Sequence, residues 1–390
     1  MPDLPGSYAL DIPALARLFR DRTNSYKYLF FLSLLDEVVA PRFDVVRGRV
    51  PLQLVVAGML ARAYHPVRTF HLSLGRQDKL AAILAAFEDR HGPLKASLSQ
   101  EGFDRLRKTF AAATDLEAQP LTRYVPTRLL RPFFRKEDLA GLPDSRVDGA
   151  LQTLAREQFD DRAPLYRLED DDLVVHPHWI AYLRANHAVV EEWALWEWLQ
   201  YLQGHNPSAP ALATKVLPVR ERAALGAETR YWNDLVASQP TRCLYTDELL
   251  RPGAFDLDHY LPWSFVGHDR LWNLVPVSKK ANSQKSDQLP PARFLPGLVR
   301  LQAAGLAHAR ERLGAPAFAR VTEPFLEDLK LVEPELRLPS GGRLEERLGE
   351  AYRGIVLPLW DLARAHGYEQ WEGVAVNSAP ARGTREPFHA

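Results

Sequence analysis

In its second half the sequence places a carboxylate, an imidazole and two side-chain amides at fixed intervals. Asp258 and His259 are adjacent, Asn273 follows His259 by fourteen residues, and Asn282 follows nine residues later. An Asp-His pair alone carries almost no information, but asparagines at both intervals lower the chance expectation to about 10⁻³ per chain. We therefore expect the fold of this region to bring these four side chains together.

The residues around this set predict a short series of elements. Residues 242–245 and 254–259 are each typical of a short strand, and the turn between them contains Gly253, so the pair is expected to form a hairpin. Residues 262–276 predict a long loop. Ser278 is a suitable cap for a helix that ends near Ser286. The order is therefore strand, strand, loop and helix, with Asp258 and His259 at the end of the second strand.

The residue types in this set suit hydrolysis of a phosphodiester. A hard cation such as Mg²⁺ prefers oxygen ligands and is often held by one or two protein groups together with substrate phosphate. Asp258 supplies a carboxylate and Asn282 an amide oxygen. A free imidazole has a pKa near neutrality, which suits His259 to be a general base on water. Asn273 is expected to tie the loop backbone together and to hold the imidazole in place.

The string from Asp256 to Phe265, followed by Asn273, Asn282 and Lys285, resembles the HNH endonucleases, the ββα-metal family. It is similar to the Cas9-type HNH subtype, which has Asn in the third motif position. The similarity covers about 50 residues of the HNH domain; no RuvC-like motif is evident, so the chain is not expected to be a Cas9.

The resemblance implies an activity and a role for each motif residue. Asp258 and Asn282 would be metal ligands for Mg²⁺ or Mn²⁺, His259 the general base and Asn273 the structural asparagine. It also implies that one DNA strand is cut per site, leaving a 5′-phosphate and a 3′-hydroxyl.

The chain departs from many HNH proteins in its cysteines. Those proteins carry two CxxC pairs that bind a structural zinc, whereas Cys243 is the single cysteine here and Thr246 stands where its partner would be. No structural zinc is therefore expected. Cys243 is expected to be a buried apolar side chain, and the hairpin to be held by packing of Tyr245, Phe255 and Trp272.

Further polar residues near the motif have two interpretations each. Lys279, Lys280 and Lys285 could contact phosphate or lie on a solvated helix face, and Lys285 is favoured because it recurs in the motif. Asp256 shares the face of Asp258 on a regular strand, so it either supports the site or is a solvated carboxylate. His268, which lies within this segment, is not expected to bind metal. His176 and His178 lie far from the motif and are not expected to bind metal either.

Charge adds a second candidate contact for nucleic acid. Lys plus Arg and Asp plus Glu both total 49, so the formal net charge is zero, which disfavours a protein that coats DNA by bulk charge. Residues 121–136 nevertheless contain five basic residues and no acid, interleaved with Tyr124, Phe133 and Phe134, and residues 270–286 contain four basic residues and no acid. The DNA contacts expected from the first stretch are Arg123, Arg128 and Arg131.

The rest of the chain predicts a mainly helical α+β protein with an embedded ββα nuclease unit. We expect four regions: helical 1–115, mixed 116–205 with a β-hairpin and a Trp-rich helix, nuclease 206–295, and helical 296–390. Helices are predicted over 12–21, 24–40, 52–64, 77–90, 144–158, 179–203, 219–238, 297–314 and 343–366. The hairpin is predicted over 165–176, a linker over 206–218, and a frayed tail beyond residue 375.

Three interpretations of function stay open. The first is a metal-dependent DNA endonuclease, in bacterial defence or in a mobile element. The second is a ββα module that binds nucleic acid or protein without hydrolysis, and the third is a nuclease acting on RNA. The N-terminal region could contact a protein or guide partner. The longest strongly apolar run near the N-terminus, over 28–35, is shorter than the roughly 20 residues that span a bilayer, and no signal peptide is evident. We therefore expect a cytoplasmic protein with no membrane partner.

Overall fold

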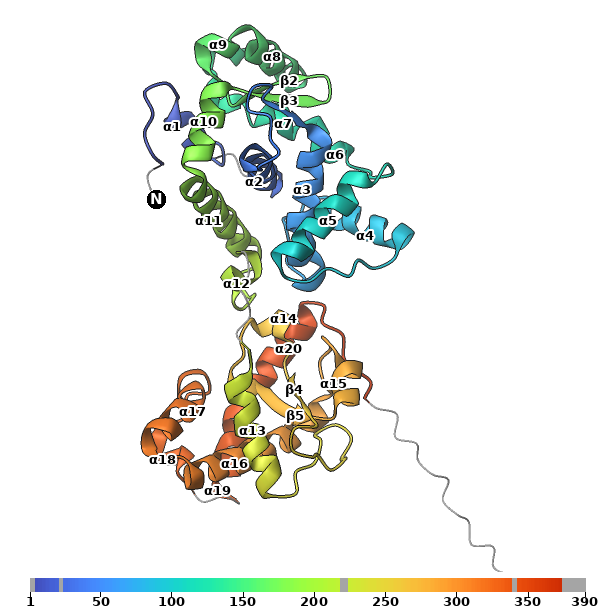
Figure 1. The fold of residues 1–390 in the computed structure, drawn as a ribbon, viewed down its shortest axis with the longest axis vertical. Coiled ribbons are helices and arrows are strands. Elements are labelled where there is room, and N and C mark those ends of the chain that lie inside the picture. Colours follow the sequence, from blue (N-terminus) through green and yellow to red (C-terminus); the bar gives the residue numbers. More distant parts are fainter. Residues whose placement is uncertain (1–3, 21–23, 218–223, 339–341, 374–390) are drawn as a thin grey trace, which may run out of the picture. The chain divides into compact units, whose positions relative to one another are not determined.

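The computed structural model describes residues 4–20, 24–217, 224–338 and 342–373. The chain divides into two compact units, unit 1 over residues 1–222 and unit 2 over residues 223–390 (Figure 1). Both are mainly helical with small sheets, as the sequence predicted. The expected tail beyond residue 375 and most of the loop expected around residues 339–342 lie outside the described residues. In the described part of the chain, no helix combines the length and the apolar character needed to cross a bilayer.

Unit 1 contains most of the helices. Its elements are α1 Ile12–Ala16, α2 Tyr26–Val39, β1 Arg49–Pro51, α3 Leu52–Tyr64, η1 His65–Thr69, α4 Leu80–His91, α5 Gln100–Ala112, α6 Gln119–Arg123, α7 Val125–Arg128, η2 Arg131–Phe133, η3 Glu137–Leu139, α8 Asp144–Glu157, α9 Phe159–Arg162, β2 Tyr166–Glu169, β3 Asp172–Val175, α10 Pro177–Ala185, α11 His187–His205 and α12 Leu212–Val216.

The core of unit 1 forms around α2, which is buried on nearly every side by α3, α10 and α11. The helix is rich in Phe and Leu, and that composition suits a helix that is enclosed all round. Gly58 on α3 faces Ser33 on α2, and a Cβ at position 58 would lie 2.8 Å from the Ser33 Cβ. The close approach of α2 and α3 therefore depends on a residue without a side chain.

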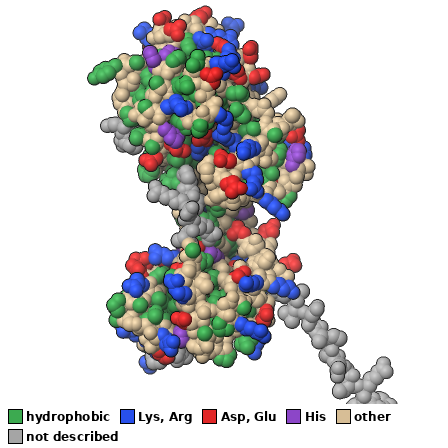
Figure 2. Space-filling model, in the orientation of Figure 1, with side chains coloured by type: hydrophobic (Ala, Val, Ile, Leu, Met, Phe, Trp, Pro, Cys, Tyr) green, Lys and Arg blue, Asp and Glu red, His purple; other side chains and the backbone are tan. Residues whose placement is uncertain are grey.

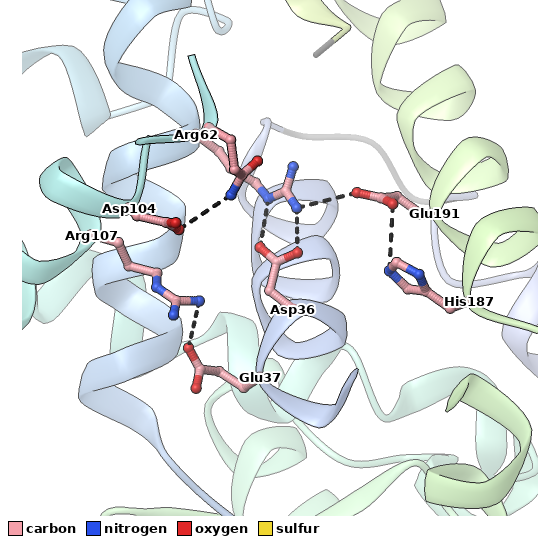
Figure 3. A network of polar contacts seen from close by, with 8 residues as sticks. Asp36, Glu37, Arg62, Asp104, Arg107, His187 and Glu191 are labelled. Atoms are coloured by element: carbon pink, nitrogen blue, oxygen red, sulfur yellow. Dashed lines mark hydrogen bonds and ion pairs between the residues drawn. The ribbon is translucent and has the colours of Figure 1, made fainter. Parts of the chain in front are cut away.

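Charged side chains also join α2, α3, α5 and α11 (Figure 3). The Arg62 guanidinium bonds both carboxylate oxygens of Asp36, with Nε–Oδ2 at 3.0 Å and Nη2–Oδ1 at 2.5 Å, and lies 3.5 Å from Glu191. Arg107 lies 3.1 Å from Glu37. These side chains are largely buried, so each charge needs its partner to remain inside the unit.

The predicted β-hairpin of unit 1 is present, but it belongs to a larger sheet. Strands β2 and β3 pair antiparallel, with Glu169 opposite Asp172 at the turn. Strand β1, which was not predicted, pairs antiparallel with β3 and gives the strand order β1-β3-β2. A three-residue strand is too short to show an alternating pattern.

Several helix predictions for unit 1 need correction. The first helix ends at Ala16, and α5 was not predicted. The helix predicted over 52–64 has the bounds of α3, and η1 continues it through Pro66. The single Trp-rich helix is two helices, α10 and α11. Trp179, Trp193 and Trp198 are buried as expected, but Trp196 is 49% exposed. Helix α8 starts at Asp144 as predicted and has no side-chain cap.

Unit 2 surrounds a two-stranded sheet with helices. Its elements are α13 Gly226–Ser238, β4 Asp256–His259, α14 Trp263–Val266, η4 Leu271–Asn273, β5 Leu274–Val277, α15 Lys279–Lys285, η5 Ala292–Phe294, α16 Leu295–Arg312, α17 Ala315–Asp328, α18 Glu333–Leu336, α19 Arg343–Ala351, η6 Tyr352–Val356 and α20 Leu357–Ala365. The sequence analysis missed α17 and α18, and the helix predicted from residue 343 is a series of α19, η6 and α20.

The predicted pairing of the hairpin over 242–259 is wrong. The strand β4 is present, but its antiparallel partner is β5, which lies in the segment predicted to be a loop. Residues 242–249 form a tight turn with one isolated bridge, between Arg242 and Leu249. Strand β5 was not predicted because it contains Pro276, a residue that is rare inside strands. Both strands of a two-stranded sheet are edge strands, and proline is tolerated there.

Candidate functional site

The β4–β5 pair positions the Asp-His dipeptide at the end of a short, buried sheet. Asp258 pairs with Val275, and His259 with Leu274. All four residues of β5 are buried, so its side chains anchor the sheet in the core of unit 2. Asp258 is only 3% exposed. A carboxylate in such a place needs hydrogen-bond donors and a compensating charge.

Lys285 and Tyr245 meet that need. Lys285 Nζ donates to Asp258 Oδ1 at 2.9 Å and to the His259 backbone oxygen at 2.8 Å. The Tyr245 hydroxyl donates to Asp258 Oδ2 at 2.6 Å. Lys285, predicted as a phosphate contact or an exposed lysine, is fully buried with its charge directed at Asp258. It lies at the C-terminal end of α15 and joins that helix to β4.

The Tyr245 hydroxyl acts as a fixed donor in this arrangement. Burial of the ring, reinforced by the negative charge of Asp258, raises the pKa of Tyr245 well above its ordinary value. The hydroxyl therefore keeps its proton at neutral pH and donates a hydrogen bond to Asp258. The ring itself packs edge-on against Phe294 and Trp371, so the sequence was right to place Tyr245 in the core but gave no sign of its polar contact.

His259 is oriented by a residue that the sequence analysis missed. Its Nε2 lies 2.7 Å from Asp269 Oδ1, in the loop that follows α14. An ionised carboxylate only accepts hydrogen bonds, so Nε2 carries the hydrogen, and in the neutral ring Nδ1 is left as the acceptor. A signal was present: Asp269 is the single acid between residues 260 and 286.

Asn273 closes the loop rather than contacting the imidazole. Its Oδ1 accepts from the Leu261 N–H at 2.8 Å, and its Nδ2 donates to the Leu261 carbonyl at 2.9 Å. The Tyr260 N–H donates to the Asn273 carbonyl at 2.8 Å. The side chain is wholly buried. Asn273 therefore holds together the two ends of the 260–273 segment, which follows directly after His259.

Substitution of Asn273 is expected to loosen this loop. Asn273→Ala would leave the buried N–H and C=O of Leu261 without partners, at about 1–3 kcal/mol for each group. Thermal unfolding of the full chain measures the effect. Asn233→Ala is the matched control, because the hydrogen bond that Asn233 makes among the described residues, from the Gly253 N–H, lies at the surface. Equal melting temperatures for Asn273→Ala and Asn233→Ala would contradict the proposed role of Asn273.

Asn282 lies on α15, which crosses β4. The helix starts as predicted, because Ser278 Oγ accepts from the Ala281 N–H at 3.4 Å. The Asn282 amide donates to Asp256 Oδ2 at 3.3 Å. Asp256 thus contacts a candidate metal ligand, which fits the supporting role considered for it. Within the described residues, no hydrogen bond reaches Asn282 Oδ1.

The oxygen donors of the site suit a divalent cation that retains several waters. Each Asp258 oxygen accepts one of the described hydrogen bonds and keeps further lone-pair capacity, and Asn282 adds an amide oxygen. Among the described residues there is no cluster of three or more His, Cys, Asp or Glu side chains able to hold a metal. One carboxylate and one amide, completed by water and phosphate, are a donor set of the kind that such a cation takes.

The positive charge counted over residues 270–286 is smaller in the structure. Arg270 pairs with Glu327 at 3.1 Å and Asp328 at 3.4 Å, both from α17. Lys285 is paired with Asp258. Lys279 and Lys280, in the first turn of α15, remain exposed. The net charge counted over residues 270–286 does not include Glu327 and Asp328, which the fold brings to Arg270 from α17.

The other residues singled out in the sequence have structural contacts. Cys243 is buried, and its Sγ accepts from the Ser278 N–H at 3.3 Å. His268 packs edge-on against Trp272, and burial lowers its pKa. His176 accepts from the His178 N–H at the start of α10. Phe255 and Trp272 are buried in unit 2 as expected. Arg123, Arg128 and Arg131 all lie in unit 1.

Comparison with known proteins identifies the family that this segment resembles. Residues 243–291 match the model of an HNH endonuclease family. No curated protein and no solved structure matches the chain. The matched residues include β4, β5 and α15 and all four residues of the polar set. HNH nucleases generally use a divalent metal and act on nucleic acid. The match therefore supports an HNH endonuclease segment and a nuclease-type function for it.

Proposed function

We propose that the chain is a metal-dependent HNH endonuclease of the Cas9-type subtype, and that it hydrolyses DNA phosphodiester bonds by cutting one strand at each site. In this proposal β4, β5 and α15 are the ββα-metal unit. The observations that support it are the match of residues 243–291 to HNH endonucleases and the packing of α15 on β4, where Asn282 bonds Asp256 and Lys285 bonds Asp258. Bacterial defence and mobile elements are the settings that suit such an enzyme.

The metal site is proposed at Asp258 and Asn282, with Mg²⁺ or Mn²⁺ as the ion. When bound, the cation supplies neutralising charge for the phosphate and for the departing oxygen. Lys285 holds Asp258 on the sheet and balances its charge before substrate arrives. Asp256 holds the Asn282 amide, which directs the oxygen of that amide away from the Asp256 contact.

His259 is proposed as the general base. Asp269 fixes Nε2 as the protonated nitrogen, so Nδ1 is the atom that accepts a proton from the attacking water. Asp269 also stabilises the imidazolium that forms. Asn273 sets the path of the chain just after His259 and thereby contributes to its position. Water attacks the phosphorus, and the bond between phosphorus and the 3′ oxygen breaks. The products are a 5′-phosphate and a 3′-hydroxyl.

The ends of the cut strand test this chemistry. We expect nicks made in plasmid DNA with Mg²⁺ or Mn²⁺ to be sealed by DNA ligase without further treatment, because ligase needs a 5′-phosphate beside a 3′-hydroxyl. RNA of the same sequence, digested in parallel, should be cut more slowly. Nicks that ligase cannot seal would contradict the direction of cleavage, and faster cleavage of RNA would change the proposed substrate.

A binding module without hydrolysis is the alternative. The observation that favours it is the Lys285–Asp258 ion pair, since the ammonium already balances the carboxylate that would attract a cation. Such a module would retain DNA in a gel-shift assay and show no cleavage with any divalent ion.

A further inference from the structure

A hollow in unit 1 gathers basic side chains from α2 and from the segment 128–144. Its volume is about 700 Å³, and the charged residues that line it are Lys27, Arg128, Arg131, Arg135, Lys136 and Asp144. We call it the basic hollow. Its five cations face one acid, although the chain as a whole has no net charge and basic and acidic side chains are interspersed over the visible surface (Figure 2).

The fold separates these cations into compensated and uncompensated groups. Arg128 pairs with Asp148 at 3.1 Å and with Asp144 at 3.2 Å. In the described part of the chain, no ion pair involves the side chains of Arg131, Arg135 or Lys136. The acid of the hollow is therefore already engaged by Arg128, and Arg131, Arg135 and Lys136 add uncompensated positive charge.

Two buried aromatic residues lie between the three uncompensated cations in the sequence. Phe133 and Phe134 are buried, and they separate Arg131 from Arg135 and Lys136, which are exposed. The aromatic residues of this stretch are thus anchors in the core and not a surface for stacking bases. Cations collected on a concave, low-dielectric wall focus the electric field and raise the local concentration of anions.

We propose that the basic hollow binds the phosphate backbone of DNA, with Arg131, Arg135 and Lys136 as the contacting residues. This inference rests on the nuclease function proposed above and adds a second contact for its substrate. It also corrects the contact predicted from sequence: Arg128 is occupied by its two carboxylates, and charge reversal there would disturb α8 as well as any DNA contact.

The positive surface continues beyond the hollow, which favours a chain of phosphates over a single small anion. The Arg123 and Arg128 guanidinium groups each lie 4.9 Å from the centre of the Tyr124 ring. Arg128 lines the hollow, so Tyr124 places a further exposed cation, Arg123, beside it. Sequence-independent contacts of this kind position a nucleic acid and make binding salt-dependent.

Charge reversal tests the inference. The variant Arg131→Glu/Arg135→Glu/Lys136→Glu of the full chain is compared with Arg76→Glu/Lys95→Glu/Lys108→Glu, which reverses three exposed cations of unit 1 outside the hollow. Affinity for a labelled DNA duplex is measured in EDTA at several salt concentrations. We expect the hollow variant to lose about tenfold or more in affinity and the magnitude of its salt slope to fall by about 2–3, because each lost phosphate contact removes about 0.9. The control should change little.

Each other outcome overturns the inference. Unchanged affinity and slope in the hollow variant would exclude the contact, and equal losses in the two variants would indicate bulk charge instead. A deoxynucleoside monophosphate that binds as tightly as the duplex would indicate a site for a small anion. If the hollow variant with three glutamates has a lowered melting temperature, Arg131→Gln/Arg135→Gln/Lys136→Gln replaces it. This variant should also bind the duplex more weakly than the wild-type chain.

The test separates this inference from the nuclease proposal. Binding is measured without divalent cation, so a chain that fails to cut DNA can still show or lack the contact. If the wild-type chain cuts DNA and both variants bind DNA as tightly as it does, the nuclease proposal stands and DNA binding by the basic hollow is excluded.

Discussion

His259→Ala is expected to lower the rate of DNA cleavage by about 10²–10⁴-fold, the usual contribution of a positioned general base. The loss should appear in single-turnover cleavage at saturating enzyme, since the side chain acts on water and not in binding DNA. The fold should be retained, because the imidazole contacts the partly exposed Asp269 and contributes little to the core.

Two further variants define that result. His178→Ala removes an exposed histidine of unit 1 and should cleave at the wild-type rate. Asp269→Ala should cause a smaller loss than His259→Ala, because it removes the group that orients the base and not the base itself. A His259→Ala protein that cleaves as fast as His178→Ala would refute the assignment of the base.

Lys285→Met is expected to destabilise the chain by roughly 3–5 kcal/mol, because it leaves Asp258 as a buried charge without its counterion. For a unit of this size the loss corresponds to a fall of about 6–20 °C in the melting temperature of unit 2. The matched control is Lys280→Met, which replaces an exposed lysine on the same helix and should change stability by less than about 0.5 kcal/mol.

A double-mutant cycle isolates the ion pair itself. Asp258→Asn alone leaves Lys285 charged and buried, so it should also destabilise the chain. The double variant Asp258→Asn/Lys285→Met should lose less than the sum of the single variants, with a coupling energy of about 1–3 kcal/mol. Strict additivity would show that the two side chains do not depend on each other.

The sequence predicted one strand and the helix around the motif, but not the pairing of that strand. The β4 strand and the Ser278-capped α15 were predicted, and their positions put Asp258 and Asn282 on adjoining elements. The partner of β4 was assigned wrongly, because Pro276 obscured β5. A periodic pattern needs several residues to be visible, and both strands have only four.

The contacts around the site could not be predicted, because they depend on which side chains the fold brings together. Lys285 looks like an exposed lysine in sequence, and only the packing of α15 across β4 shows that it is buried on Asp258. Asp269 contacts His259 from ten residues away, across a loop whose path is set by Asn273. The net charge counted along the sequence treated Arg270 and Arg128 as free cations, for the same reason. In the fold, each is paired with two carboxylates.

The central claim, that residues 243–291 form a working metal-dependent nuclease, is tested most directly by incubating purified protein with supercoiled plasmid. We expect the wild-type chain to convert the plasmid to open circles with Mg²⁺ or Mn²⁺. No conversion should occur in EDTA or with His259→Ala purified in the same way. A wild-type chain that leaves the plasmid intact with both metals, or that nicks it equally in EDTA, would show that the chain is not a metal-dependent nuclease.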